Sequence, residues 1–277
     1  MNLSQFIINA LAEDVGDGDH TSLSCISITQ QGKAHLLVKE NGMAAGIELA
    51  KQIFEIVDTT VAFHPLKNDG DSMLVGDVLF TVTGNSQSIL KAERLVLNCM
   101  QRMSGIATTT AKYVKEVEGL TTKILDTRKT TPLCRNIEKW AVKIGGGYNH
   151  RFGLFDMIMI KDNHVDYAGG IANAIHHTMA YLKTSGKDLK VEIETRNLKE
   201  VNQVLEIGNV DRILLDNMQP ELLKEAVQII NNRVETEASG GITLQTIRNY
   251  AETGVNFISV GALTHSAKSI DLSLKAF

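Results

Sequence analysis

The sequence predicts two regions of different fold class: a mixed α+β region, followed by alternating strands and helices of the α/β type. Short strands and one apolar helical face mix over roughly the first hundred residues. From about residue 121, apolar strands, polar loops and amphipathic helices repeat in order, which is typical of parallel β/α units. The strands of this second region also end in charged or glycine-rich residues. We place the boundary between residues 110 and 111.

The composition is that of an ordinary globular protein. Of its 277 residues, 43% are hydrophobic and 22% charged, enough for a sizeable core without disulfides or metals. The 28 Lys and Arg residues against 32 Asp and Glu residues give a net charge of -4, which argues against a nucleic-acid-binding protein held by overall basicity. No segment has the length or flanking charges of a membrane span or signal peptide. We expect no nucleic-acid or membrane partner.

The cysteines indicate a reducing compartment. Cys25, Cys99 and Cys134 are odd in number, widely spaced and free of any CxxC pair, so they form neither a disulfide framework nor a zinc site. We therefore expect a cytoplasmic protein and give none of the three a catalytic role.

The elements of the first region follow from local periodicity. Residues 33–40 and 78–83 predict strands, and residues 46–57 predict a helix between them. Residues 88–118 predict a mostly helical segment that is broken near Ser104 and Gly105. An initial helix is predicted by apolar residues that share one face: Leu3, Phe6, Ile7, Ala10 and Leu11.

The second region contains six predicted strands, each followed by a segment long enough for a helix. These strands cover residues 123–125, 157–160, 190–193, 212–215, 234–237 and 256–260. The apolar stripes of the helices after the third and fourth strands are interpreted as core packing.

Charged or glycine-rich groups stand at the C-terminal end of each of these strands. They lie at residues 126–129, 161–164, 192–194, 216–217, 237–241 and 261–262. Because the loops after the strands of a β/α barrel converge at one rim, which carries the chemistry, we predict that these groups form a single site.

Two loops of the second region are rich in cations. Residues 126–132 (DTRKTTP) carry Arg128 and Lys129, and Arg135 follows; guanidinium groups suit carboxylates and lysine suits phosphate. The alternative is a solvated loop. Residues 145–151 (GGGYNHR) end in His150 and Arg151, which suggests an anion pocket, although a lone histidine is more often structural.

Acidic and glycine-rich groups complete the predicted rim. Glu194 and Asp216 can act as acid and base or hold Mg²⁺, and the alternative is structural pairing with Lys161 or Lys129. The glycines of residues 239–242 and 261–266 suit a phosphate site in the last two β/α units, whereas each alone could be a plain turn.

Together these motifs closely resemble the quinolinate phosphoribosyltransferase family over essentially the whole chain. The resemblance extends to residues 13–19 (EDVGDGD), 93–94, 104–107 and 259–262. It implies an N-terminal α/β sandwich domain over residues 1–110 and an incomplete β/α barrel over residues 111–266. A C-terminal helix, residues 267–277, is expected to pack back on the first domain, and the chain is expected to form a homodimer or larger homo-oligomer.

The resemblance also implies a reaction. Quinolinate and 5-phosphoribosyl 1-diphosphate would give nicotinate mononucleotide, diphosphate and carbon dioxide, with Mg²⁺, in the de novo synthesis of NAD. One alternative is a same-fold relative that uses another acceptor, such as the one associated with molybdenum transport, and the retained Arg-Lys and Asn-His-Arg sets disfavour it. A non-catalytic phosphate-binding protein is the other, and Glu194 and Asp216 speak against it.

Matching motif positions assign roles to individual residues. The quinolinate side comprises Arg94, Thr127, Arg128, His150, Arg151 and Lys161. The sugar-diphosphate side comprises Lys129, Lys161, Glu194, Asp216, Ser239, Gly240, Gly241, Gly261 and His265. Lys129, Glu194 and Asp216 are the expected catalytic residues, the two carboxylates are the expected Mg²⁺ ligands, and Arg94 is expected to act in the active site of the neighbouring subunit.

One position departs from the family pattern. The family commonly has glycine after the proline of the cationic loop, whereas Leu133 follows Pro132 here. Because a positive φ is costly for leucine, we expect a type I turn at this point.

Overall fold

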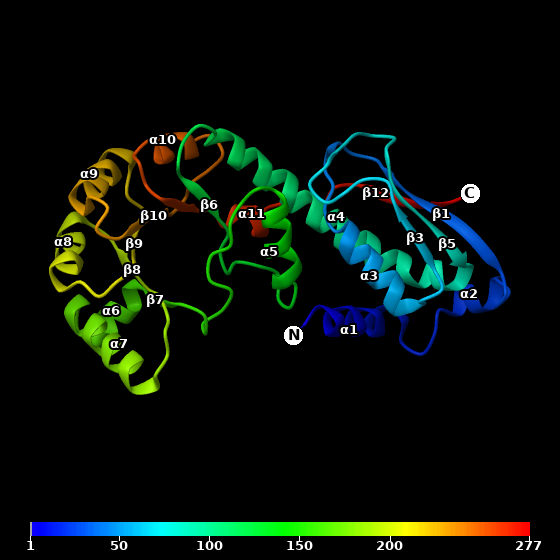
Figure 1. Cartoon of the computed structure of the whole chain (residues 1–277), viewed down its shortest axis with the longest axis horizontal. Coiled ribbons are helices and arrows are strands. Elements are labelled where there is room, and N and C mark those ends of the chain that lie inside the picture. The colour runs from blue at the N-terminus through cyan, green and yellow to red at the C-terminus, as the bar shows by residue number, and fades with distance from the viewer. Residues whose placement is uncertain (1) are drawn as a thin grey trace. The chain divides into compact units, whose positions relative to one another are not determined.

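The computed structural model describes residues 2–277, which form two compact units (Figure 1). The first unit comprises the chain up to Ala111, Thr130–Gly146 and Leu263–Phe277; the second comprises Lys112–Lys129 and Gly147–Ala262. Residues 130–146, which we expected in the barrel, therefore group with the first unit. Within the described residues, no helix has the length and apolar character required to cross a membrane.

The first unit is built on a four-stranded antiparallel sheet with the strand order β12-β1-β5-β3. Its strands are β1 (Gln31–Val38), β3 (Ala62–Pro65), β5 (Val78–Asn85) and β12 (Leu272–Ala276), with a separate pair, β2 (Gly42–Met43) and β4 (Ser72–Met73). Its helices are α1 (Leu3–Val15), α2 (His20–Cys25), α3 (Ile47–Val57) and α5 (Arg135–Ile144), together with most of α4 (Ser86–Glu116). The aromatic rings of Phe54, Phe63 and Phe80 join α3 to the sheet, with centroids 4.5–6.1 Å apart. The predicted α+β fold of this region is confirmed.

The predicted C-terminal helix over residues 267–277 is wrong, because the chain ends in strand β12. Val38 pairs with Leu272 and Leu36 with Leu274 in an antiparallel ladder between β1 and β12. Leu272 and Leu274 are buried while Lys275 is exposed, an alternation with the period of two that a strand requires.

The predicted break in the long helix is also wrong, since α4 runs without interruption from Ser86 to Glu116. A Cβ atom at Gly105 would collide with the backbone carbonyl of Lys268. The hydroxyl of Ser104 accepts a hydrogen bond from the backbone N–H of Ala45 at 3.1 Å. These small residues therefore allow close packing against the helix and do not end it.

The second unit contains a six-stranded parallel sheet with the order β6-β11-β10-β9-β8-β7. Its strands are β6 (Lys123–Leu125), β7 (Ile158–Ile160), β8 (Val191–Thr195), β9 (Arg212–Asp216), β10 (Glu235–Ser239) and β11 (Phe257–Ser259). Its helices are α6 (Asp162–Ala168), α7 (Ile171–Ser185), α8 (Leu198–Ile207), α9 (Pro220–Ile230) and α10 (Ile247–Ala251), and α11 (Ala262–His265) begins at its end. All six predicted strands are present, and helices α6–α10 curve around one side of them (Figure 1). Because β6 and β7 are edge strands, the barrel is incomplete, as expected.

The two faces of this sheet differ in chemistry. Successive side chains of a strand point to opposite faces, so one face collects Ile193, Ile213, Leu215 and Ile258, all buried under the covering helices. We call the opposite face the charged face; it carries Glu192, Glu194, Arg212, Asp216, Glu235 and Glu237. Bulky apolar residues usually fill a β/α barrel, so this face is specialised.

The turn before α5 differs from the expected type I geometry. The N–H of Cys134 donates to the carbonyl of Thr131 at 3.1 Å, which places Pro132 and Leu133 at the two central positions. Leu133 has a φ of 64°, in the left-handed region that a type II turn requires at its second central residue. The turn therefore has the backbone conformation that glycine favours at this position, although the residue there is the exposed Leu133.

Substituting glycine for Leu133 is therefore expected to stabilise the protein by about 1 kcal/mol, because the left-handed conformation costs an L-residue about 1–2 kcal/mol and glycine's larger entropy loss offsets part of the gain. The leucine side chain is 77% exposed and contributes little burial. Urea unfolding of the L133G variant measures the difference. Asn209→Gly is the matched control: its φ is 60°, but asparagine tolerates this region, so a smaller gain is expected. A lower unfolding free energy for L133G than for the wild type would contradict this account.

Candidate active site

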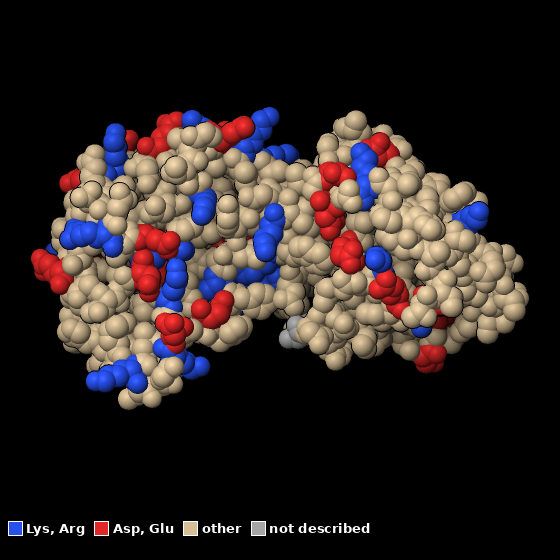
Figure 2. Space-filling view, in the orientation of Figure 1, with Lys and Arg blue, Asp and Glu red and all other residues tan. Residues whose placement is uncertain are grey.

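The ends of the parallel strands bring the predicted site residues of the second unit to one rim. Lys161 directly follows β7, Glu194 lies near the end of β8, and Asp216 and Ser239 end β9 and β10. Thr127, Arg128 and Lys129 follow β6, and Gly261 follows β11. On the part of the surface formed by β6–α10, Lys and Arg atoms lie in a hollow beside Asp and Glu atoms (Figure 2).

The acidic part of the rim combines two carboxylates with one lysine. The Nζ atom of Lys161 lies 3.6 Å from Oε2 of Glu194. Burial raises the pKa of Glu194, the charge of Lys161 lowers it, and the charge of Asp216 raises it further. Glu194 and Asp216 therefore lie close enough to repel each other. The backbone N–H of Lys161 donates to Nδ1 of His164 at 2.9 Å, which fixes the start of α6.

The basic part of the rim holds two guanidinium groups near each other. Burial lowers the pKa of Arg151, and the positive charge of Arg128 lowers it further. Arg151 also donates from Nη1 to the carbonyl of Met157 at 3.2 Å, which restrains its side chain. In the neighbouring loop, the N–H of Lys129 donates to Oγ1 of Thr127 at 3.0 Å. An anion between Arg128 and Arg151 would relieve their repulsion, so the pair suits a carboxylate substrate.

A glycine turn lies against the end of β9. Gly240 and Gly241 have φ values of 102° and 61°. A Cβ atom at Gly240 would overlap the side-chain amide of Asn217, and Asn217 donates from Nδ2 to Oδ2 of Asp216 at 2.6 Å. Glycine thus lets the backbone after Ser239 approach Asn217, which in turn contacts the carboxylate of Asp216.

His150 lies below the rim, in the interior of the unit. Its Nε2 atom is 3.0 Å from Oε2 of Glu192 and 3.4 Å from Oε2 of Glu237. Burial alone would lower the pKa of His150, but the two carboxylates outweigh it and raise the pKa to about 9. Nδ1 accepts the N–H of Arg151 at 2.7 Å. Because an accepting Nδ1 carries no hydrogen, the ring keeps its one hydrogen on Nε2, and the additional proton of the cluster lies on Glu192, whose own pKa burial raises.

Asp126 connects the two cation-rich loops. Its Oδ1 atom accepts the backbone N–H of His150 at 2.8 Å, and its own N–H donates to the carbonyl of Tyr148 at 3.0 Å. Its position in the first loop was visible in the sequence, but its role was not. Glu192 and Glu237 stood among the predicted strand-end groups but were given no role, and Arg212 was missed. The available signal was their spacing, since Glu192 lies two residues before Glu194 and Glu237 two before Ser239, on the same face.

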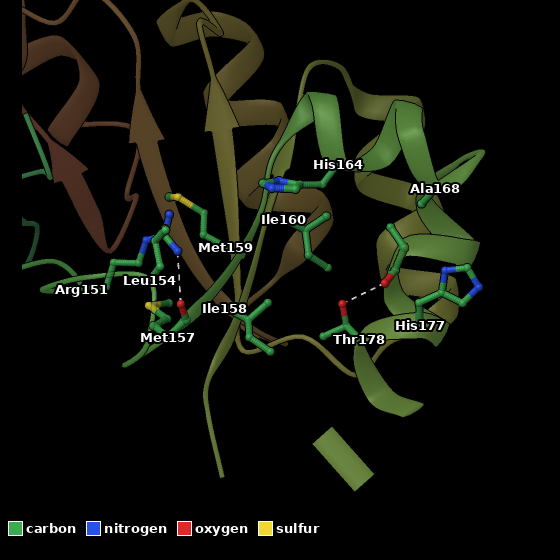
Figure 3. A pocket seen from close by; sticks show the side chains of 11 residues that line it. Arg151, Leu154, Met157, Ile158, Met159, Ile160, His164, Ala168, His177 and Thr178 are labelled. Carbon is green, nitrogen blue, oxygen red and sulfur yellow. Dashed lines mark hydrogen bonds between the residues drawn. The ribbon is translucent and has the colours of Figure 1, made fainter. Parts of the chain in front are cut away.

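A pocket lies along the free edge of β7 (Figure 3). Arg151, Met157 and Met159 line one side of it, while Ile158 and Ile160 point toward α7 (Figure 3). Among the predicted site residues, its lining includes Arg151 alone.

Two of the predicted site residues belong to the first unit. Arg94 is an exposed residue of α4, and His265 ends α11, where its Nδ1 atom lies 2.7 Å from the hydroxyl of Ser266. Neither is part of the rim described above for the second unit.

The buried cluster around His150 makes stability depend on pH. The folded state holds a proton up to a pH of about 9, whereas an unfolded histidine releases it near 6.5. This contribution is fully present below pH 6.5, and the free energy of unfolding is expected to fall as the pH rises from there through about 9. Urea unfolding across this range measures the fall, and H150N is expected to flatten it. A wild-type stability that stays level or rises across the window would refute this assignment.

Comparison with known proteins places the chain in a family. The model of the quinolinate phosphoribosyl transferase N-terminal domain matches residues 19–104, and that of the C-terminal domain matches residues 106–275. The chain is 48% identical to quinolinate phosphoribosyltransferase [decarboxylating] 1b of Nicotiana tabacum, over 96% of this chain and 80% of that protein. It is 40% identical to the probable nicotinate-nucleotide pyrophosphorylase [carboxylating] of Bacillus subtilis, over 99% of this chain and 93% of the relative.

A solved structure agrees with these relatives. The crystal structure of NadC from Streptococcus pyogenes superimposes with a TM-score of 0.92 at 39% identity, covering 99% of this chain and 95% of that one. Since both domain models match, and relatives match over nearly the whole chain, the chain belongs to the quinolinate phosphoribosyltransferase family.

Proposed function

We propose that this protein transfers the phosphoribosyl group of 5-phosphoribosyl 1-diphosphate to quinolinate, releasing diphosphate and carbon dioxide and forming nicotinate mononucleotide. The relatives named above carry this activity in their names. The observation that carries the proposal is that the strand ends and loops of the second unit hold two charged pairs, the guanidinium groups of Arg128 and Arg151 and the carboxylates of Glu194 and Asp216. The two guanidinium groups suit a dianionic ring, and the two carboxylates suit a sugar that becomes positively charged during transfer.

The cations orient quinolinate in this proposal. Arg128, Arg151 and Lys161 bind its two carboxylates so that the ring nitrogen faces the anomeric carbon of the ribose. Thr127 completes this side of the site, whereas His150, which was expected to contact quinolinate, is buried below the rim and supports Arg151 through its backbone N–H. Positioning and charge stabilisation then supply most of the rate enhancement.

The carboxylates and Lys129 act on the sugar diphosphate. Positive charge develops on the ribose as diphosphate leaves, and Glu194 and Asp216 stabilise it. Lys129 takes up negative charge on the leaving group. The phosphate of the ribose binds at the backbone of Ser239, Gly240, Gly241 and Gly261, with His265. After transfer, the C2–carboxylate bond breaks to release carbon dioxide, the positive ring nitrogen stabilises the electron pair left on C2, and a proton from water then forms the C2–H bond of nicotinate mononucleotide.

Mg²⁺ fits the acidic part of the rim. Glu194 and Asp216 offer hard oxygen donors from neighbouring strands, and their mutual repulsion favours a cation between them. These two residues would hold Mg²⁺, directly or through substrate and water, and the ion would neutralise charge on the diphosphate.

The proposal extends to a homodimer in which Arg94 completes the site of the neighbouring subunit. Arg94 is exposed on α4, in the unit that does not contain the rim. It adds a further cation for the quinolinate carboxylates.

Release of labelled carbon dioxide from quinolinate tests the proposed reaction. We expect release to require both 5-phosphoribosyl 1-diphosphate and Mg²⁺, and nicotinate to be a poor acceptor. K129A is expected to lower kcat by about 100-fold or more while the circular dichroism spectrum stays unchanged, because it removes charge stabilisation of the leaving group. Release without the sugar diphosphate would contradict the proposed reaction, and normal turnover by K129A would contradict the role given to Lys129.

Mixing two inactive variants tests the shared site. After subunit exchange, equal amounts of R94A and K129A should regain about a quarter of wild-type activity, since half of the dimers are hybrids with one intact site. K91A, which alters an exposed lysine on the same helix, should keep full activity. If subunit exchange is verified and no activity returns, Arg94 acts in its own subunit or not at all.

A further inference from the structure

The floor of the candidate site is a buried chain of charged side chains. Nη1 of Arg212 donates to Oε2 of Glu237 at 2.7 Å, and the same oxygen lies 3.4 Å from Nε2 of His150. Glu192 contacts that nitrogen from the neighbouring strand β8 at 3.0 Å. The side chains of Glu192 and Glu237 are fully buried, and that of His150 is 5% exposed.

Arg212 is itself held from three sides. Besides Glu237, its guanidinium donates to Oε2 of Glu235 at 3.0 Å and lies 3.9 Å from the centre of the Phe257 ring. Because these contacts restrain Arg212, the carboxylate of Glu237 is restrained as well. The cation also offsets part of the cost of burying two carboxylates side by side.

Stability alone is a weak explanation for this arrangement. Well-packed apolar side chains of similar volume commonly replace buried ion pairs at no cost in folding free energy. The carboxylates also lie one strand repeat, two residues, below Glu194 and Ser239 of the rim. Their position points to a role in the site above them.

The imidazole of His150 transmits this restraint to the rim. Nε2 faces the two carboxylates, and Nδ1 accepts the backbone N–H of Arg151 at 2.7 Å. Arg151 is then held at its backbone by His150 and at its guanidinium by the carbonyl of Met157. Loss of the carboxylates would free the ring to rotate about its side-chain bonds and would remove one of these two restraints.

We propose that Glu192 and Glu237 are positioning residues for the acceptor site: they fix the His150 ring, which in turn sets the Arg151 guanidinium in the orientation that binds a quinolinate carboxylate. Arg212 balances their charge and holds Glu237. This inference rests on the proposed function, because quinolinate is the ligand whose binding it explains.

Substitutions at Glu192 test the proposal. E192L keeps the approximate volume but has no acceptor atom, and E192Q keeps an acceptor oxygen. We expect E192L to raise the KM for quinolinate about tenfold or more, since losing one restraint on a charged contact costs about 1.4 kcal/mol or more. The KM for 5-phosphoribosyl 1-diphosphate should stay within about twofold of the wild type. E192Q should recover most of the affinity for quinolinate.

A paired substitution tests Glu237 without leaving a buried charge. R212M/E237L removes both members of the ion pair, so it should fold even if E237L alone does not. It should raise the KM for quinolinate in the same way. T236V is the matched control: Thr236 precedes Glu237 on β10, points to the opposite face and donates from Oγ1 to Asn256 at 2.9 Å. T236V should lower the melting temperature slightly and leave both KM values unchanged.

Calorimetric binding of quinolinate to the same proteins separates the possible failures. A wild-type protein that neither binds nor converts quinolinate overturns the proposed function and this inference together. If the wild type is active and both E192L and R212M/E237L keep quinolinate affinity within twofold, the positioning role is wrong. A fall in melting temperature with unchanged KM values would show that the cluster is only structural, and would equally overturn it.

Discussion

The structure of the second unit depends on the cost of placing charges on one face of a parallel sheet. Alternation sends apolar side chains such as Ile193 and Ile213 to the helices, and it sends Glu192, Glu194 and Glu237 to the other side. Buried carboxylates are stable only when cations or hydrogen-bond donors compensate them. The carboxylates of the charged face therefore need compensating groups, and these groups differ between the buried residues below the rim and the residues at the rim.

Below the rim, the protein supplies these partners itself. Arg212 and His150 compensate Glu237 and Glu192, and the cluster is shielded from water. At the rim, Lys161 compensates Glu194 only in part, since it is half exposed and 3.6 Å away. Arg128 and Arg151 in turn repel each other. A dianionic ring would place carboxylates between these two cations, and Mg²⁺ would lie beside Glu194 and Asp216. The net charge of -4 conceals this arrangement, because the cations and carboxylates are separated locally.

The spacing of apolar residues along the sequence predicted most of the fold. Six short apolar runs at regular spacing predicted the six strands, and their charged ends predicted the rim. The same period of two in Leu272, Leu274 and their neighbours would have indicated β12, but a single isolated strand has no partner visible in the sequence. Gly105 looked like a helix breaker because composition does not reveal that the backbone of Lys268 packs against it. Leu133 shows the opposite case, where the residue type argued against the backbone conformation that the turn adopts.

The position of the candidate site at the strand ends could be predicted from the sequence, but the buried contacts below the rim could not. Strand ends are marked by sequence, so Lys161, Glu194 and Asp216 could be placed on one rim. Contacts across the sheet depend on the strand register and on loops that return to the sheet. The pairing of His150 with Glu192 and Glu237 depends on both.

A crystal structure with quinolinate bound tests the central claim most directly. We expect its carboxylates to contact Arg128, Arg151 and Lys161 above the charged face, with the His150 ring held by Glu192 and Glu237. Quinolinate bound elsewhere, with these cations facing solvent, would contradict the account.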